Sequence, residues 1–286
     1  MRKLVVIIKF FLKIISKFPL LTRATKYAFH KVYKNKGNFL YYEKNNLSFV
    51  LHRNETISNS IFLDDEFEFS KFLCAYKIIK KKKRTLIDIG ANLGSISIPA
   101  LKKNYFEKAI LFEPNPESLR LLKINILINN LEEKAILNEL ALSNTKSSKI
   151  LKSDLRFNRG DNRLISNRKI LAKNHFKVKT DLLDNYTSKY SKDNCFIKID
   201  VQGEECNILI SSKKTLFKKI PIMIEFEPKN LKKNWIKYYV YIIKYYEYVY
   251  DLKEKNLSKI TNNKSNLENL FKIYEKKNSF TDLLFV

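Results

Sequence analysis

The sequence predicts an α/β fold, with a mostly parallel sheet, helices on both faces of the sheet and an antiparallel strand at the C-terminal end. After Arg84, short apolar strands alternate with helical stretches, which is typical of crossover units in a parallel sheet. A glycine-containing turn joins the first of these strands to its helix, and two strand-like segments close the chain. At 286 residues the chain is long enough for one such domain and an N-terminal appendage.

The chain divides into three parts. Residues 1–36 form a basic amphipathic segment, residues 37–84 a lead-in region, and residues 85–286 the main domain. The strands expected in the main domain are Thr85–Ile89, Lys108–Phe112, Ala135–Leu140, Cys195–Ile199, Ile222–Phe226, Tyr248–Leu252 and Asp282–Val286. The helices expected there are Leu93–Lys103, Pro116–Asn129, Ile208–Leu216 and Trp235–Tyr246.

The N-terminal segment predicts an amphipathic helix over Leu4–Phe18. Lys9, Lys13 and Lys17 recur every four residues and therefore share one helical face, with Arg2 and Lys3 nearby. The stretch is too short and too charged to span a bilayer, and no small-x-small cleavage site follows it, so a secretory signal is not expected. Two alternatives stay open: the helix packs on the domain with its lysines in water, or it docks on a membrane surface.

The lead-in region combines a short β pattern with a helix. Alternating apolar residues at Leu47, Phe49 and Leu51 indicate a small β element between Gly37 and Asp65. A helix over Glu66–Lys80 follows and leads into a run of cations that ends at Arg84. The helix macrodipole favours cations at this end, so the run is read as a solvated helix terminus.

The formal net charge of +26 suggests an anionic partner such as nucleic acid, a membrane surface or an acidic glycan. We discount this suggestion, because a chain rich in lysine, asparagine and isoleucine with only 5 Gly and 6 Pro has the composition expected from an AT-rich genome. Four arginines, Arg156, Arg159, Arg163 and Arg168, either bind an anionic sugar or phosphate or are solvated loop charges.

Cysteine and histidine give no support for a disulfide framework or for metal catalysis. Cys74, Cys195 and Cys206 form no C-x-x-C pair, and the three histidines lack ligand spacing, so no metal is predicted. A reducing, cytoplasmic compartment fits this pattern best.

The segment Thr85–Gly94 is a strand that enters a tight turn at Gly90 and then a helix. Ligands of open α/β sheets bind at the carboxyl ends of strands, where a glycine lets the backbone approach a cofactor closely. Asn92 and Ser95 replace the second and third glycines of the dinucleotide fingerprint, and no Walker A sequence is present, so pyrophosphate binding is disfavoured. Asp88, on the strand, suits a cationic cofactor.

A second strand, Ala109–Glu113, ends in a carboxylate roughly 20 residues after the glycine turn. At this distance Rossmann-type sites hold a ribose by its hydroxyl groups. Glu113 is therefore predicted to accept both ribose hydroxyls.

Four motifs in order resemble the FkbM family of methyltransferases: Asp88–Gly94, Phe112–Pro116, Phe196–Glu205 and Ile224–Glu225. Val178–Asp184 and Thr281–Val286 also look like segments of that family, so the similarity extends from Thr85 to the end of the chain. The resemblance implies a Rossmann-like class I methyltransferase fold, S-adenosylmethionine as cofactor, and O-methylation, commonly of sugar hydroxyls in surface glycans or natural products.

The resemblance also implies positions for the cofactor. It places five residues around the methionine part and the turn: Asp88, Gly90, Ala91, Asn92 and Gly94. It places Glu113 on the ribose, Asn115 near the adenine edge and Ala141 in the adenine pocket.

Asp200, at the end of the fourth strand, is placed by the resemblance closest to the point where methyl donor and acceptor meet. Methyl transfer from a sulfonium is an in-line displacement that also needs a proton removed from the hydroxyl, so Asp200 is predicted to be the general base or to orient the acceptor. Glu205 and Glu225 are predicted as supporting acids, His175 is an outside candidate, and Gln202 receives no acid–base role.

The predicted function is thus O-methylation of a sugar, glycan or glycolipid hydroxyl, with peripheral membrane contact through residues 1–20 and without a nucleic-acid partner. An RNA methyltransferase is the first alternative. The positive charge suits it, although the Asn-Pro-Pro-Tyr and Pro-Cys sequences of base methylation are absent. A non-catalytic, membrane-associated binding module is the second. The location expected is cytoplasmic, with attachment to the inner face of the membrane if the N-terminal helix docks there.

Overall fold

A computed structural model describes residues 38–53, 55–79, 84–153, 162–165, 174–231, 241–253 and 259–286. Several predicted features lie outside the described residues. These are the basic helix Leu4–Phe18 with its lysines, most of the cationic run before Arg84, residues Arg156, Arg159 and Arg168, and the first part of the helix expected over Trp235–Tyr246, of which residues 241–245 are helical.

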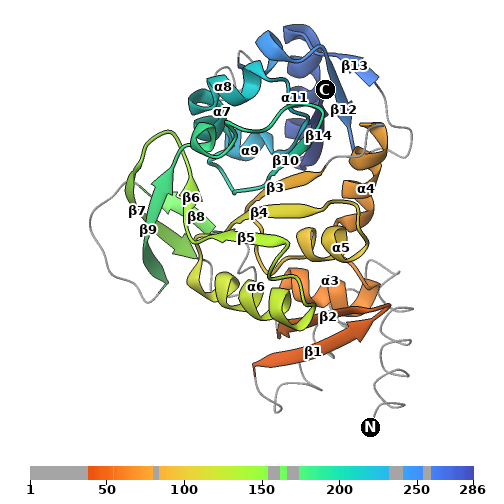
Figure 1. Ribbon diagram of the computed structural model, residues 1–286. Coiled ribbons are helices and arrows are strands. Elements are labelled where there is room, and N and C mark those ends of the chain that lie inside the picture. Colours follow the sequence, from red (N-terminus) through yellow and green to blue (C-terminus); the bar gives the residue numbers. More distant parts are fainter. Residues whose placement is uncertain are drawn as a thin grey trace.

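The main domain is built on an eight-stranded sheet in the order β13-β12-β14-β11-β10-β3-β4-β5 (Figure 1). Its strands are β3 (Thr85–Ile89), β4 (Lys108–Phe112), β5 (Ala135–Asn138), β10 (Cys195–Ile199), β11 (Ile222–Phe226), β12 (Tyr248–Asp251), β13 (Lys259–Thr261) and β14 (Thr281–Phe285). Strands β11, β10, β3, β4 and β5 pair in parallel, whereas β14 is antiparallel to β11 and β12. The predicted fold class, with its antiparallel C-terminal strand, is confirmed.

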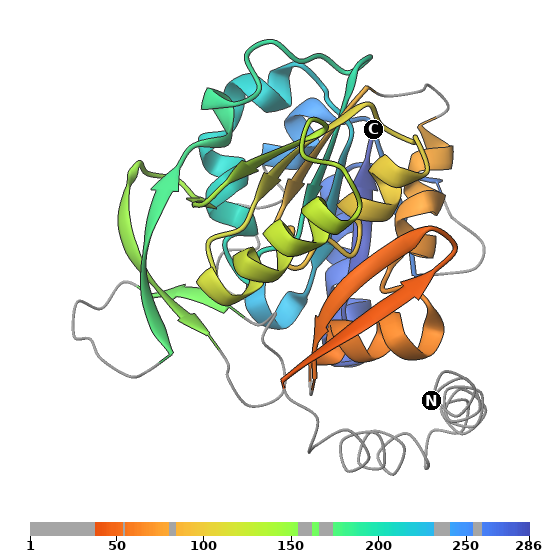
Figure 2. The same ribbon diagram turned by 60° about the horizontal axis from the view of Figure 1, so that its bottom comes forward.

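Helices cover both faces of this sheet (Figures 1 and 2). One face packs against α4 (Phe69–Ile78), α5 (Ser97–Lys102) and α6 (Pro116–Ile128), and the other against α7 (Glu205–Ser211), α8 (Lys213–Phe217), α9 (Pro228–Leu231) and α11 (Lys264–Lys276). Successive strand residues point to opposite faces, so Leu86 joins the first core and Ile87 the second. Among the described residues, no helix has the length and apolar character needed to cross a membrane.

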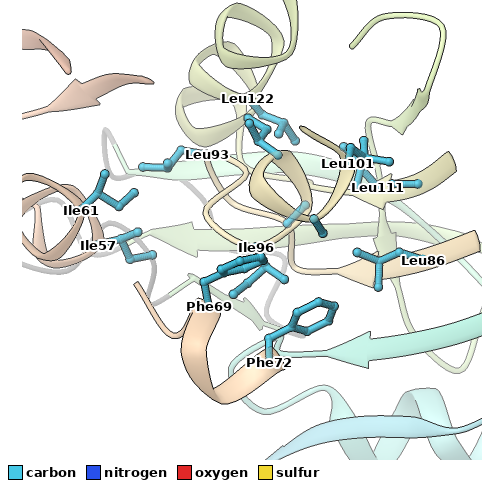
Figure 3. Packing of buried hydrophobic residues seen from close by; sticks show 14 of the residues in the cluster. Ile57, Ile61, Phe69, Phe72, Leu86, Leu93, Ile96, Leu101, Leu111 and Leu122 are labelled. Atoms are coloured by element: carbon cyan, nitrogen blue, oxygen red, sulfur yellow. The ribbon is translucent and has the colours of Figure 1, made fainter. Parts of the chain in front are cut away.

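The first core is a cluster of buried hydrophobic residues in which the lead-in region packs against the sheet. Figure 3 shows side chains from α4, α5, α6 and α3 (Thr56–Asp64) converging on the apolar face of β3 and β4. Phe72 of α4 is fully buried and stacks on Phe196 of β10, with ring centroids 5.5 Å apart. The lead-in region is therefore part of the same core as the main domain.

Several features differ from the sequence prediction: α3, β13 and α11 were not predicted, and three further differences bear on the site. The helix expected from Leu93 begins at Ser97, because the glycine turn occupies the residues before it. The helix expected over Ile208–Leu216 is two helices, α7 and α8, which meet at Ser212. A second sheet, of order β6-β9-β7-β8, was not predicted. It consists of β6 (Ala141–Leu142), β7 (Ser147–Ser153), β8 (Asn162–Ile165) and β9 (His175–Asp181), and it stands to one side of the main sheet (Figure 1).

Two asparagines of α6 attach the hairpin of β1 (Phe39–Lys44) and β2 (Leu47–His52) to the domain. Asn125 accepts from the Val50 amide at 2.6 Å and donates to the Val50 and Leu93 carbonyls at 3.3 and 3.0 Å. Asn129, one helical turn later, accepts from the Ser48 amide at 3.1 Å and donates to the Ser48 carbonyl at 2.6 Å. On this edge β2 has no partner strand among the described residues, and the two side-chain amides supply the hydrogen bonds that such a strand would make.

Asn125→Ala should lower the free energy of unfolding by about 2–4 kcal/mol, because it leaves buried backbone groups of Val50 and Leu93 without partners. Chemical denaturation of the variant measures this loss. Lys123→Ala on the same helix removes only an exposed ion pair with Glu139 and should change stability by less than about 1 kcal/mol. Equal effects of the two substitutions would show that Asn125 does not hold the hairpin.

Candidate functional site

A cavity of about 510 Å³ opens at the carboxyl ends of the central strands, where ligands bind in open α/β sheets. Eight of the predicted site residues line it: Asp88, Gly90, Ala91, Asn92, Glu113, Ala141, Asp200 and Glu225. Three others, Gly94, Asn115 and Glu205, do not line it, nor does His175. Most of the predicted residues therefore line one cavity, and the remainder do not reach it.

Gly90 is the point at which two strand ends touch. Its φ is +84°, and a Cβ atom added there would lie 1.8 Å from the carbonyl oxygen of Asp200. The amides of Gly90 and Ala91 both donate to the Phe112 carbonyl at 3.0 Å, which closes the turn against β4. Asn92 adopts φ +49°, a left-handed conformation that asparagine tolerates better than most residues, so the turn forms without the second glycine of the dinucleotide fingerprint.

Glu113 follows β4 and holds the same turn from the other side. Its carboxylate accepts from the amides of Asn92 and Asn115, each at 2.8 Å. Burial raises the pKa of Glu113 to about 7, although these two hydrogen bonds favour the ionised form. The side chain therefore changes charge near neutral pH while it lines the cavity.

Asn115 and Gly94 support the residues that line the cavity without lining it themselves. Asn115 is fully buried, accepts from the Glu117 amide at 2.9 Å at the start of α6, and donates to Ser153 Oγ and Asn162 Oδ1 at 3.2 and 2.7 Å. It thereby joins the second sheet to the main one. A Cβ on Gly94 would lie 2.5 Å from Ile98 Cδ1, so this position keeps α5 close to the turn.

At the end of β10, a buried lysine forms ion pairs with two aspartates. The ammonium of Lys198 lies 3.5 Å from Asp88 Oδ1 and 3.3 Å from Asp200 Oδ2. Asp88 also accepts from the Ser97 hydroxyl, but its buried Oδ1 has no hydrogen-bond partner. Burial lowers the pKa of Lys198, but the carboxylates of Asp200 and Asp88 raise it by more, so its pKa is above the ordinary value and it stays charged.

Glu225, at the end of β11, is the neighbouring acid. Gln202 donates to Glu225 Oε2 at 3.0 Å and to Asp200 Oδ1 at 3.5 Å, so one amide joins the two carboxylates. Burial and the charges of Asp200, Glu205 and Asp282 raise the pKa of Glu225 well above its ordinary value. Glu225 is thus inclined to hold a proton at a pH where exposed glutamates are ionised.

Glu205 supports the loop that carries Asp200. It is buried in the first turn of α7 and accepts from the amides of Gly203 at 2.9 Å and Val201 at 3.4 Å. Burial raises the pKa of Glu205 to about 7, with the charge of Asp200 adding to the effect. The carboxylate acts on the loop backbone and lies behind the cavity wall.

Lys198 and a second, partly buried group of charges were not predicted from the sequence. Lys71 of α4 lies 2.9 Å from Glu68 Oε1 and 2.5 Å from Asp282 Oδ2 of β14. The position of Lys198, two residues before Asp200 on one strand, places both on the same face and was a usable signal. No pattern in the sequence indicates that Glu68 and Lys71 of the lead-in region lie beside the last strand of the sheet.

Two basic residues that the sequence singled out, His175 and Arg163, also lie in the described part of the chain. His175 begins β9, is half-buried and lies away from the cavity wall. Arg163 of β8 lines the cavity, and its Nη1 donates to Asn230 Oδ1 at 2.9 Å. Within the part of the chain that the structure describes, no group of three or more histidine, cysteine, aspartate or glutamate side chains is arranged to hold a metal ion.

Comparison with known proteins finds one matching family model, described as the methyltransferase FkbM domain, over residues 88–254. No curated protein matches the chain.

Solved structures similar to this chain include a methyltransferase FkbM from Methylobacillus flagellatus, at 14% identity and a TM-score of 0.46 over 72% of this chain and 44% of that one. This chain therefore covers less than half of that protein's length. A precorrin-6y C5,15-methyltransferase from Geobacter metallireducens is 12% identical, with a TM-score of 0.39 over 75% and 86% of the two chains. M. jannaschii TYW2 in complex with AdoMet is 14% identical, with a TM-score of 0.38 over 88% and 86%.

Gly90→Ala should cost more than about 3 kcal/mol of stability or prevent folding, because the methyl group would overlap the Asp200 carbonyl. Gly203→Ala is the matched control: Gly203 has φ +105°, but nothing lies within 4 Å of an added Cβ. It should cost only about 1–2 kcal/mol of backbone strain. Thermal unfolding compares the variants, and a Gly90→Ala protein as stable as the control would show that the two strand ends are not in contact.

Proposed function

The chain belongs to the FkbM methyltransferase family, and on this premise we propose that it transfers a methyl group from S-adenosylmethionine to a hydroxyl oxygen of a sugar, glycan or glycolipid. The observation that carries the proposal is the acid-rich cavity at the carboxyl ends of β3, β4, β10 and β11. It combines groups that suit a cationic cofactor with carboxylates that can accept a hydroxyl proton.

The residues present fit S-adenosylmethionine, which supplies a methyl group carried on a positively charged sulfur. Asp88 offers a buried carboxylate oxygen that accepts no hydrogen bond from the described residues and lies 3.5 Å from the Lys198 ammonium. Gly90 has no side chain, so the backbone itself lines the cavity at the end of β3. Glu113 lines the same cavity after the neighbouring strand. We assign Asp88 and residues 90–92 to the methionine part, Glu113 to the ribose and Ala141 to the adenine pocket. Gly94 and Asn115 keep this wall in shape.

Asp200 is assigned as the general base. It is only partly buried, lines the cavity and follows a central strand whose residues are fully buried. The acceptor hydroxyl gives its proton to the Asp200 carboxylate as the oxygen attacks, which avoids building up a full oxyanion. Glu225, joined to Asp200 through Gln202, accepts a second hydroxyl of the acceptor, and Glu205 holds the loop in position.

The charge of the cavity favours a neutral acceptor with several hydroxyls. Seven acids line it, Glu68, Asp88, Glu113, Asp200, Glu204, Glu225 and Glu227, against three cations, Arg163, Lys198 and Lys229. This excess is opposite in sign to the net charge of +26 on the whole chain. Phosphates entering such a cavity would be repelled, whereas sugar hydroxyls would find hydrogen-bond acceptors on several sides.

Methylation of RNA is the second candidate, and the charge of the whole chain supports it because cations outside the cavity can bind a phosphate backbone. A lipid-linked acceptor is a further possibility within the first proposal. In that case residues 1–20, which lie outside the described residues, would hold the enzyme at an anionic membrane surface.

Glu113→Gln should weaken S-adenosylmethionine binding by roughly tenfold or more, because two ribose hydroxyls lose an ionised acceptor. Since burial raises the pKa of Glu113 to about 7, the advantage of the wild type should grow as the pH rises through this value and shrink below it. Calorimetry between about pH 6 and pH 8 measures the ratio of the two affinities. Glu117→Gln, an exposed glutamate on α6, should bind like wild type, and a pH-independent ratio would refute the ribose assignment.

Asp200→Asn should lower methyl transfer by about 10²-fold or more while cofactor affinity stays within a few-fold, as expected for a lost general base. Wild type and variant are incubated with labelled S-adenosylmethionine and separate glycolipid, glycan and RNA fractions from the organism that produces the protein. Mass spectrometry then identifies the product. Asp193→Asn, an exposed aspartate before β10, serves as the control. Labelled RNA would select the second candidate, and full activity of Asp200→Asn would require another base.

A further inference from the structure

Lys198 occupies a position where a lysine is costly. It is the fourth residue of β10, a central strand, and its side chain is only 5% exposed. An ammonium is rarely buried to this extent unless carboxylates pair with it. Lys198 lines the cavity without being assigned to the cofactor or to the acceptor, so its burial there needs another explanation.

The register of the sheet explains which groups surround it. Lys198 lies directly opposite Asp88 in the parallel pair of β10 and β3, and Asp200 follows two residues later on the same face. Its ammonium is 3.5 Å from Asp88 Oδ1 and donates to Asp200 Oδ2 at 3.3 Å. The charges of Glu68 and Asp282, from α4 and β14, also act on it. No other cation of the described residues forms an ion pair with Asp88 or Asp200.

The arrangement has a clear electrostatic consequence. Two carboxylates in one partly desolvated site repel each other, and without a counter-charge one of them would hold a proton. One ammonium between them removes that repulsion and leaves a single net negative charge facing the cavity. Asp88 keeps an oxygen without a hydrogen-bond partner, and Asp200 keeps its exposure to the cavity.

We propose that Lys198 is a positioning residue of the methyl-transfer site: its ammonium holds Asp88 and Asp200 as an ionised pair, so that the first can receive the cationic cofactor and the second the acceptor's proton. The inference deepens the proposed function and rests on it. Lys198 acts through the two carboxylates and is not itself assigned to the reacting atoms.

Lys71 provides a matched control. It is a second ion-paired lysine on the same side of the sheet, with a side chain 23% exposed, and it pairs with Glu68 and Asp282 in the way that Lys198 pairs with Asp88 and Asp200. Unlike Lys198, it does not line the cavity. Lys71→Met therefore removes a partly buried, ion-paired charge without touching the pair that is proposed to meet the ligand.

The test measures protons released when S-adenosylmethionine binds, by calorimetry in buffers of different ionisation enthalpy. In Lys198→Met the carboxylate pair should hold a proton that the cationic ligand displaces, so this variant should release up to about one proton more per ligand than wild type. Lys198→Arg should release the same number as wild type, and any extra proton released by Lys71→Met, whose partner Glu68 lines the cavity, should persist in Lys71→Met/Asp200→Asn because it does not belong to the Asp88–Asp200 pair. Lys198→Met/Asp200→Asn, which lacks the second carboxylate, should lose the extra proton.

A second measurement needs no ligand and separates this inference from the proposed function. With a proton shared by the pair, the free energy of unfolding of Lys198→Met should fall more steeply as the pH rises from about 5 to 8 than that of Lys198→Met/Asp200→Asn, since the native state then binds more protons than the unfolded state. Equal pH dependence of these two variants would overturn the inference. Failure of wild type to bind S-adenosylmethionine would refute the proposed function while this comparison still decides the state of the carboxylate pair.

Discussion

The contact between Gly90 and the Asp200 carbonyl is the constraint on which the site depends. A Cβ atom at Gly90 would lie 1.8 Å from that oxygen, and the Asp200 amide donates to the Ile89 carbonyl at 3.0 Å, so the ends of β3 and β10 stay in register beyond the strands themselves. The strand that carries the cofactor turn and the strand that carries the proposed base therefore end at one place. A side chain between them would separate the two halves of the reaction.

The electrostatics of the site follow from this close approach. When strand ends converge, the carboxylates that follow them converge as well, and burial then raises the free energy of their ionised forms. The protein meets this cost with Lys198 between Asp88 and Asp200, and with Lys71 between Glu68 and Asp282. Glu225 accepts from the Gln202 amide and forms no ion pair with a cation of the described residues, and burial together with the neighbouring acids raises its pKa. The result is an acid-rich cavity inside a strongly basic chain.

Two additions to the central sheet complete the cavity, and both are attached through asparagine side chains. Asn115 joins α6 to Ser153 and Asn162 of the second sheet, whose β8 contributes part of the cavity wall. Asn125 attaches the β1–β2 hairpin, and α3 after it adds Thr56 and Ile57 to the cavity lining. Each amide offers both a donor and an acceptor, so it can satisfy a buried backbone or side-chain group without introducing charge.

The central sheet and the residues at its strand ends could be predicted from local sequence patterns. Strands β3, β4, β10 and β11 have the predicted bounds, because buried parallel strands appear as short apolar runs between turn signals. The turn at Gly90 and the acids Asp88 and Glu113 could be predicted because they lie within or directly after such a run, and the resemblance to the family pointed to Asp200. The second sheet, the charge pairs and the division between cavity-lining and supporting residues became visible only in the folded chain. These depend on partners far apart in the chain, such as Lys71 and Asp282, and on burial, which local sequence patterns do not encode.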